Sequence, residues 1–579
     1  MRAQLKTFIF LAAAALLSLA AQRPSLAGSA MWSKNPSDGD WNDATNWVPN
    51  TVPNGTSDMA TFGASKVTEV FNSNTIVNVD SLVFNPGAPS YTISAYLDNI
   101  ELSGAGIVNN SGTTQFFVAG TFVFFNSATA GNMTSFTNVG DFIAFEDTSS
   151  AGSATIDLTD NMYQAHMSFS VNSTAAEATI SASAGANIGF FDASTGGNAT
   201  FNLTTEASVI FTQESNADHA TGNCIGGDQY FGAYVLFQEF ASAGEGSFTA
   251  FGGSTRGEKG GFVEFDQYTT ADNATFVING AMGAGLAPGT LNFYDTSTAA
   301  TAKITAKGGK DGAKGGAIIF NKTSTGGTAS ISLTGNAELD ISSHKAPGVT
   351  IGSLAGKGSV LLGANTLTIG SNNQSTAFSG VISGTGGVTK SGTGTLTLSG
   401  NNTYTGLTAV KGGVLVTDNK RGSATGTGNV NVNAGTLGGE GAISGPVTMG
   451  TGSGSGAFLT PSAAAKQPAT LNLASTLIFN SDATYTCALQ AGRKKAARDE
   501  VVANGVTIQS GAQFNLVAKV QGKLKPGASF TVLSNTASTP ISGTFANLAD
   551  GAVLTVGNAK LQASYEGGDG NDLTLTVVQ

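Results

Sequence analysis

The middle of the chain repeats one pattern of apolar and polar positions. Phenylalanines recur there at intervals of 21 to 28 residues, and an apolar residue lies two positions before each of them. Seven of the nine units place Ile or Phe eleven residues after this phenylalanine, with small polar residues between the two marks. The nine residues are Phe124, Phe145, Phe169, Phe190, Phe211, Phe237, Phe265, Phe293 and Phe320.

One unit cannot bury its own apolar side and must stack on its neighbours. The unit is too short for a propeller blade and has no 3.6-residue apolar period, which leaves two short strands with period-2 alternation and a Gly/Ser/Thr bend. This describes one coil of an all-β parallel β-solenoid. Equivalent residues would then stack about 4.8 Å apart. We therefore predict that the nine phenylalanines form an interior structural ladder.

Changes of composition and residue pattern divide the chain into five parts. Residues 1–27 contain an early positive charge, an apolar run and small residues before Ala27, which predicts a secretory signal peptide. Residues 28–120 are expected to form an N-terminal β cap, 121–345 the nine-copy array, and 346–480 a second β-helix of Thr/Val/Leu strands with Gly turns. Residues 481–579 are expected to continue as a C-terminal β region.

All three tryptophans lie in the cap region, at Trp32, Trp41 and Trp47. The open end of a solenoid must be covered, and tryptophans beside Gly, Asn and Pro turns suit such a cap. Because indoles also stack on sugar rings, the three are the alternative candidates for a carbohydrate contact.

Composition limits the chemistry. A formal net charge of −11 and a pI near 4.8 argue against nucleic-acid binding. Cys224 and Cys487 exclude a disulfide framework and are expected to be separate buried thiols. His166, His219 and His344 fall in different units, so we predict no metal site, no cofactor and no catalytic residues.

Carboxylates in the array need separate consideration, because a solenoid aligns residues of different units. Asp147, Asp192 and Asp295 each lie two residues after a ladder phenylalanine, but Asn, Val, Gln, Glu and Lys occupy that place elsewhere. A solvated turn is the prediction, and the acid of a glycosidase is the alternative.

The run from Gly392 to Val416 resembles the autotransporter-associated β-strand repeat of Gram-negative surface and secreted proteins. With the preceding Lys390, it reads Lys390-x-Gly-x-Gly-Thr-Leu-Thr-Leu-Ser-Gly, then Asn402-x-Tyr-x-Gly and Gly412-Gly-Val-Leu-Val. The resemblance implies a right-handed parallel β-helix passenger, often adhesive, with no family-wide catalytic residues. Such proteins usually continue into a membrane β-barrel, whereas we expect this chain to lack that translocator.

Near the end, Gly567 to Asp572 match the first six positions of a calcium-binding nonapeptide. That site needs successive copies, and this chain has one, so we predict a β-turn. Calcium binding by Asp569, Asn571 or Asp572 stays open.

These observations predict an exported, non-enzymatic, adhesin-like or structural surface protein. Export through the Sec pathway to the cell surface or medium is expected, with the periplasm as the alternative location. The expected partners are a cell-surface polysaccharide or a host or matrix surface, the mature chain is expected to be a monomer without a transmembrane segment, and no nucleic acid is expected. A polysaccharide-active lyase or hydrolase and a carbohydrate-binding module are the alternative functions.

Overall fold

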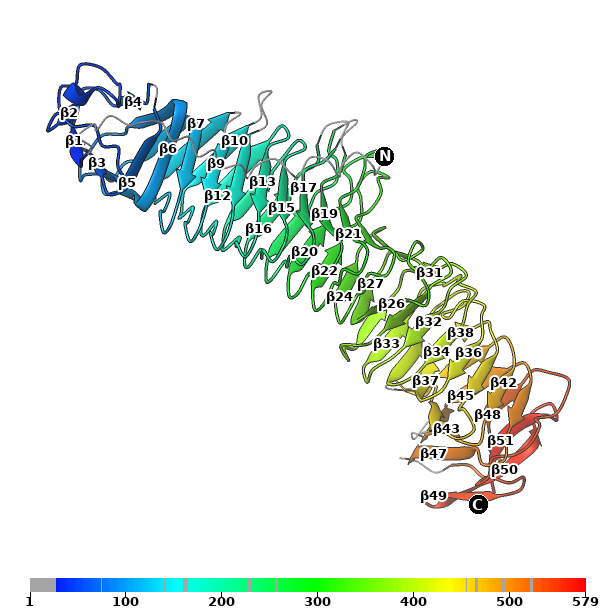
Figure 1. The fold of residues 1–579 in the computed structure, drawn as a ribbon. Coiled ribbons are helices and arrows are strands. Elements are labelled where there is room, and N and C mark those ends of the chain that lie inside the picture. Colours follow the sequence, from blue (N-terminus) through cyan, green and yellow to red (C-terminus); the bar gives the residue numbers. More distant parts are fainter. Residues whose placement is uncertain are drawn as a thin grey trace.

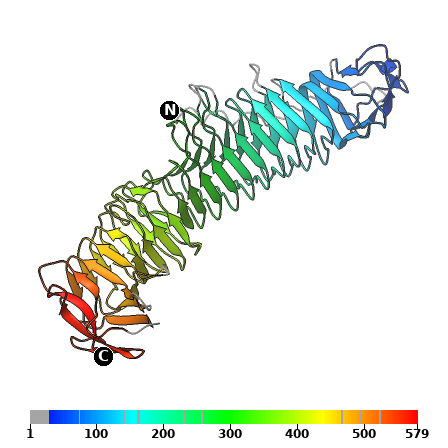
Figure 2. The same ribbon diagram turned by 180° about the vertical axis from the view of Figure 1, so that it is seen from behind.

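The computed structural model describes residues 28–578, except residue 74 and segments 140–141, 160–164, 228–230, 256–258, 455, 464–466, 492–495 and 521–523. The expected signal peptide lies outside the described residues. The described chain is an elongated stack of β coils (Figures 1 and 2). It has 51 strands and one short 3-10 helix, η1 (Ala44–Asn46). The predicted all-β solenoid is confirmed.

One column of parallel strands contains the repeated phenylalanines, and we call it the phenylalanine stack. Its strands pair in register, so that each ladder phenylalanine lies opposite the next. The strands are the end of β7 (Gln115–Phe124), β9 (Phe142–Phe145), β11 (His166–Phe169), β13 (Asn187–Phe190), β15 (Ser208–Phe211), β17 (Tyr234–Phe237), β19 (Phe262–Phe265), β21 (Thr290–Phe293), β23 (Ala317–Phe320), β25 (Glu338–Asp340), β28 (Ser359–Leu361) and β31 (Val381–Ser383).

The second column, called the facing stack, contains the Ile/Phe residues that lie eleven positions after the ladder. It consists of β8 (Thr134–Val139), β10 (Thr155–Thr159), β12 (Thr179–Ser183), β14 (Thr200–Leu203), β16 (Thr221–Cys224), β18 (Ser247–Ala250), β20 (Thr275–Ile278), β22 (Lys303–Ala306), β24 (Ser330–Leu333), β27 (Ser353–Gly356), β30 (Thr376–Phe378), β33 (Thr395–Leu398), β35 (Val414–Thr417), β37 (Gly435–Gly439), β40 (Ala457–Leu459), β43 (Ala483–Ala491) and β47 (Gln513–Val520).

The ladder phenylalanines fill the interior between the two stacks. All nine side chains are fully buried. Successive rings stack with centroids 4.5–5.0 Å apart and interplanar angles of 4–14°. From the facing stack, Phe201, Phe248 and Phe276 meet the ladder edge to face, at centroid distances of 5.6–5.8 Å. Because aromatic rings favour both geometries, the register is set by ring packing as well as by backbone pairing.

One coil departs from the repeat at Gly222, where the facing stack elsewhere carries Ile or Phe. The ring of Phe248 from the next coil occupies this space, since a Cβ on Gly222 would lie 2.6 Å from Phe248 Cδ1. The Phe248 ring therefore takes the place of the side chain that Gly222 lacks.

The third side of the coil changes along the molecule. In the array it is a column of single bridges between Ser, Thr or Asn residues, running from Gly106 to Thr325. From Gly348 onward it becomes an eight-stranded parallel sheet of β26 (Gly348–Ile351), β29 (Thr366–Ile369), β32 (Val388–Lys390), β34 (Thr408–Val410), β36 (Val430–Val432), β39 (Val447–Met449), β42 (Leu477–Phe479) and β46 (Val506–Ile508).

The N-terminal end is covered by a tryptophan cluster. Trp41 and Trp47 pack with ring centroids 4.8 Å apart, Trp32 and Trp47 lie 5.0 Å apart, and Phe62 joins all three to the first coils. This region contains β1 (Ala30–Trp32), β2 (Trp47–Val48), β3 (Met59–Phe62), β4 (Glu69–Phe71), β5 (Val77–Phe84), β6 (Thr92–Asn109) and β7 (Gln115–Phe124).

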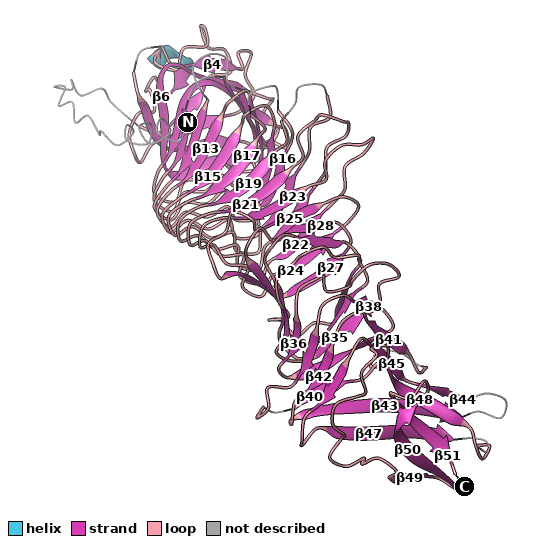
Figure 3. Ribbon diagram, turned by 90° about the vertical axis from the view of Figure 1, so that its right-hand side faces the viewer, coloured by secondary structure: helices cyan, strands magenta, loops and turns pink. Residues whose placement is uncertain are grey.

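The C-terminal end finishes with antiparallel strands (Figure 3). A fourth sheet has the parallel strands β38 (Ala442–Ile443), β41 (Thr470–Leu473), β45 (Glu500–Ala503) and β48 (Ser529–Asn535), followed by antiparallel β51 (Asp572–Val577), β50 (Ala559–Gly567) and β49 (Val553–Val556). The short strand β44 (Ala496–Arg498) pairs antiparallel with β43. The solenoid thus ends in a hairpin sheet in place of another parallel coil.

Candidate functional site

The corner before the facing stack has the same construction in seven of the nine units. Five residues after the ladder phenylalanine, a Ser, Thr or Asn side-chain oxygen accepts the backbone N–H of the residue two positions on, as in Thr174–Ala176 (3.0 Å) and Asn216–Asp218 (2.6 Å). That second residue has positive φ even where it is not glycine, for example 48° at Ala176 and 54° at Asp218. The side-chain bond stabilises a backbone that non-glycine residues seldom adopt.

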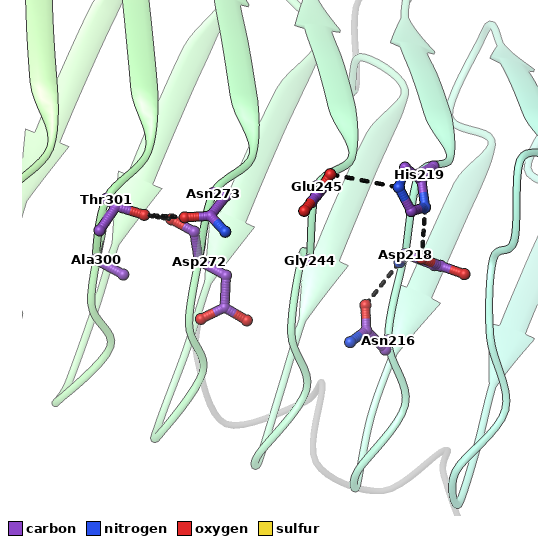
Figure 4. A pocket seen from close by; sticks show the side chains of 9 residues that line it. All are labelled: Asn216, Asp218, His219, Gly244, Glu245, Asp272, Asn273, Ala300 and Thr301. Carbon is purple, nitrogen blue, oxygen red and sulfur yellow. Dashed lines mark hydrogen bonds and ion pairs between the residues drawn. The ribbon is translucent and has the colours of Figure 1, made fainter.

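Two surface cavities lie along this corner. The first, of about 450 Å³, is shown in Figure 4. The second, of about 680 Å³, lies on the equivalent turns of earlier coils and is lined mainly by Asn, Ser and Gly, with Glu177 as its one charged residue among the described lining. The first is lined by Asn216, Asp218, His219, Gly244, Glu245, Asp272, Asn273, Ala300 and Thr301.

The first cavity is acidic. His219 lies between two carboxylates, with Nδ1 2.6 Å from Asp218 Oδ1 and Nε2 3.3 Å from Glu245 Oε2. Asp272 accepts hydrogen bonds from Thr270 Oγ1 (2.7 Å) and from the hydroxyl of Ser242. The side chains of Asp218, His219 and Glu245 are 46–63% exposed, so water screens these pairs. The arrangement can accept hydrogen bonds from hydroxyl groups of a ligand.

Potential metal ligands are dispersed along the described part of the chain. No group of three His, Cys, Asp or Glu side chains there is arranged to hold a metal ion. Cys224 and Cys487 are free and buried. Burial raises the pKa of Cys224 to about 12 and also raises that of Cys487, so both remain thiols and not nucleophilic thiolates.

The aligned aspartates of the sequence pattern do not meet one another. Asp147 Oδ2 accepts the backbone N–H of Asn126 (2.9 Å), and Asp192 Oδ2 accepts that of Val171 (3.1 Å). Each carboxylate therefore caps the left-handed turn of the preceding coil.

Asp295 differs, because it pairs with Lys322 and hydrogen-bonds Asp266. Burial, together with that hydrogen bond, raises the pKa of Asp266. The hydrogen bonds from Asp266 and Lys322 lower the pKa of Asp295. Sequence analysis missed Asp266, since it lies one residue after the ladder phenylalanine and outside the aligned column.

The tryptophans cannot serve as the sugar platform considered from the sequence. Trp41 and Trp47 are fully buried and Trp32 is 2% exposed. Their indole N–H groups donate to backbone carbonyls of Val67, Pro53 and Trp41 at 2.8–3.0 Å. This alternative is wrong, because the cap uses both the faces and the polar edges of the rings.

The calcium-like segment forms the turn between β50 and β51. Asp572 is 7% exposed, and its Oδ1 accepts the Asn535 backbone N–H at 2.8 Å. Asn571 Nδ2 donates to Ala537 O at 2.6 Å. These side chains hold the turn against the neighbouring loop, while Asn571 Oδ1 has no hydrogen-bond partner among the described residues. Calcium binding by Asp569, Asn571 or Asp572 therefore remains untested.

The residues that carry the family resemblance are interior. Lys390 is 1% exposed, and Nζ donates to the carbonyls of Ser391 (2.5 Å), Gly392 (3.0 Å) and Gly412 (3.2 Å). Burial lowers the pKa of Lys390 to about 8. Tyr404 is fully buried, and its hydroxyl lies 2.6 Å from Thr408 Oγ1. These residues close Gly-rich turns, so the repeat signature encodes coil structure and does not form a ligand site.

Comparison with known proteins agrees with the recognised resemblance. Residues 388–416 match the family PATR, the Passenger-associated-transport-repeat. A 98-residue segment is 38% identical to the adhesin BmaC autotransporter of Brucella suis biovar 1 (strain 1330), which is 17% of this chain and 3% of that protein. The chain therefore spans a small part of this curated relative. These findings show that the β-solenoid of this chain contains an autotransporter passenger repeat.

Among solved structures, the chain is similar to the Haemophilus influenzae Hap adhesin. The match covers 90% of this chain and 63% of that one, with 11% identity and a TM-score of 0.25.

Across the described residues, no helix is long and apolar enough to cross a membrane.

Proposed function

We propose that this chain is an exported, non-enzymatic β-solenoid that acts as an adhesive passenger at the cell surface. The observation that carries the proposal is the passenger-associated-transport repeat at residues 388–416, embedded in the same stack of coils as the array. The adhesin with a 38% identical segment supports an adhesive role. Export begins with the Sec signal at residues 1–27, and the mature protein is a monomer.

The partner is a polysaccharide or a host or matrix surface, contacted by the exterior of the array. The outward positions of the facing stack are mainly Ser, Thr and Asn, and residues such as Thr200, Asn202, Thr221 and Asn223 are partly exposed. Hydroxyl and amide groups in register along a rigid rod can contact a long polymer at many points. Weak contacts add in this way when all can form at once.

Two measurements test this proposal. The full chain carrying an epitope tag should become accessible to antibody or protease on intact cells, and beads coated with the purified chain should adhere to polysaccharide or matrix surfaces. Size-exclusion chromatography with light scattering should give the monomer mass. Retention of the chain inside the cell, or beads that adhere no better than albumin-coated beads, would contradict the proposal.

A polysaccharide hydrolase or lyase is the second candidate, favoured by the neighbouring carboxyls of Asp266 and Asp295. Their pKa values are moved in opposite directions, as in acid–base pairs. Reducing-end and unsaturated-product assays on pectin, alginate and glucans should stay at background. Activity that disappears in Asp295→Asn would establish the enzyme and reject the non-enzymatic role.

A further inference from the structure

Two exposed aromatic rings break the pattern of the turn that follows the phenylalanine stack. Phe240 and Tyr268 each lie three residues after a ladder phenylalanine and are 63% and 66% exposed. Their rings stack with centroids 5.4 Å apart at 11°. The other seven coils place small or polar residues at this position: Ser127, Thr148, Asn172, Ala193, Glu214, Thr296 and Thr323. Since those coils fold without an aromatic here, the solenoid does not require the pair.

Tyr268 is exposed, and its one ring contact among the described residues is with Phe240, so we call the ring face away from Phe240 the bare face. Phe240 covers the face toward the preceding coil, and the opposite face is directed toward the following coil, where the same position is Thr296. The turns of the two coils are joined by the Thr296 N–H to Gln267 O bond of 3.1 Å. A threonine is too short to cover a phenol ring across a coil spacing of about 4.8 Å. Thr296 Oγ1 is held close to the backbone by its bond to Gln267 O at 2.9 Å.

Polar groups occupy the turn of the following coil. Asp295 immediately precedes Thr296, and its carboxylate is fixed between Lys322 and Asp266. A carboxylate held by neighbours on both sides keeps lone pairs for hydroxyl donors and needs little reordering when it binds. A bare aromatic face with an adjacent fixed acceptor matches a pyranose ring, which offers C–H groups on one face and hydroxyl groups at its edge.

The charge of the neighbouring turns indicates which class of sugar this surface favours. Glu239 precedes Phe240, Asp266 lies two residues before Tyr268, and Asp295 lies in the next turn, where Lys322 pairs with it. The surplus of carboxylates repels uronic and sialic acids.

We propose that the Tyr268 face, Asp295 and Thr296 form a binding site for a neutral hexose unit of a glycan. Tyr268 stacks on the sugar, Asp295 accepts hydrogen bonds from its hydroxyls, and Phe240 holds the Tyr268 ring in place. This site rests on the proposed adhesive function and specifies its ligand class.

The test is affinity electrophoresis and calorimetry of the full mature chain with hexasaccharides of glucose, mannose and N-acetylglucosamine, with polygalacturonate as the anionic control. At least one neutral oligosaccharide should bind, and polygalacturonate should not. Tyr268→Ser should weaken binding at least about tenfold, the factor that corresponds to 1.4 kcal/mol. Thr296→Phe should do the same while keeping the tyrosine, because a new ring would cover its face.

Thr323→Ser, at the same position two coils beyond Tyr268, is the matched control and should bind like the wild type. All three variants should keep the wild-type melting temperature, since these side chains are exposed or lie on the surface turn. The site is rejected if no neutral oligosaccharide binds, or if Tyr268→Ser and Thr296→Phe bind as tightly as the wild type. If beads coated with the Tyr268→Ser chain adhere as well as beads coated with the wild-type chain, this site is rejected and the adhesive function stands. If beads coated with the wild-type chain do not adhere, the adhesive function itself is rejected.

Discussion

The array and the segment that follows it build the same kind of coil from different interiors. In the array, stacked phenylalanines fill the core, and the third side is a column of single bridges supported by Ser and Thr side chains. In the later segment the core is mostly aliphatic, the third side is a true sheet, and buried polar residues such as Lys390 and Tyr404 close the turns. The residues of the recognised repeat thus stabilise the coil, whereas the exposed aromatic pair Phe240 and Tyr268 lies in the array.

The largest expected effect is in the aromatic core. Phe190→Ala removes a fully buried ring that stacks on Phe169 and Phe211 at 4.5–4.6 Å. We expect a loss of roughly 3–5 kcal/mol, because the rigid coils cannot collapse around the cavity. Coils in a stack contact mainly their neighbours, so hydrogen exchange should rise around residues 169–211 before it rises elsewhere.

Ser194→Ala, four residues away, is the control for this prediction. Its buried hydroxyl has no hydrogen-bond partner among the described residues, so its removal should leave the melting temperature unchanged or raise it. Equal melting temperatures for the two variants would mean that the ladder does not stabilise the array.

In the later segment, Lys390 should make stability depend on pH. Its folded pKa of about 8 lies below the ordinary 10.5, so between these values the unfolded chain binds a proton that the folded chain has released. Stability should therefore rise as pH increases from 8 to 10.5, by on the order of 3 kcal/mol. Chemical denaturation across this range measures the slope, and Lys390→Met should remove this contribution. A Met variant with the wild-type slope would show that another group titrates.

Gly222 offers a test of how closely neighbouring coils are packed. Gly222→Ala should cost roughly 1–3 kcal/mol, because the new methyl group meets the Phe248 ring. Shortening that ring in Gly222→Ala/Phe248→Leu should recover part of the loss, and a double-mutant cycle by denaturant unfolding measures the coupling. Additive effects would mean that the ring is displaced freely.

The smallest effect compares two tyrosine hydroxyls. Tyr404→Phe deletes a buried hydroxyl 2.6 Å from Thr408 Oγ1 and should cost about 1 kcal/mol. Tyr268→Phe deletes an exposed hydroxyl and should leave the melting temperature within error. The reverse order would overturn the assignment of Tyr404 to the interior and Tyr268 to the surface.

The sequence by itself determined the coil, because a regular period of apolar positions has few ways to be buried. The nine phenylalanines and the parallel stacking were readable from spacing, and the run from Gly392 to Val416 was recognised by its resemblance to a known repeat family. The aligned aspartates and the tryptophans were also visible, but a one-dimensional pattern does not say which face of a turn a side chain takes.

Tertiary structure alone decided those faces. It buried Trp32, Trp41 and Trp47 in the cap, turned Asp147 and Asp192 onto neighbouring backbones, and placed Asp266 beside Asp295. It also left the Tyr268 ring exposed, although its spacing from the ladder gave no sign of this. The physical reason is that burial in a solenoid depends on what the next coil places at the same height. Contacts between coils join residues more than twenty positions apart, so a local pattern does not record them.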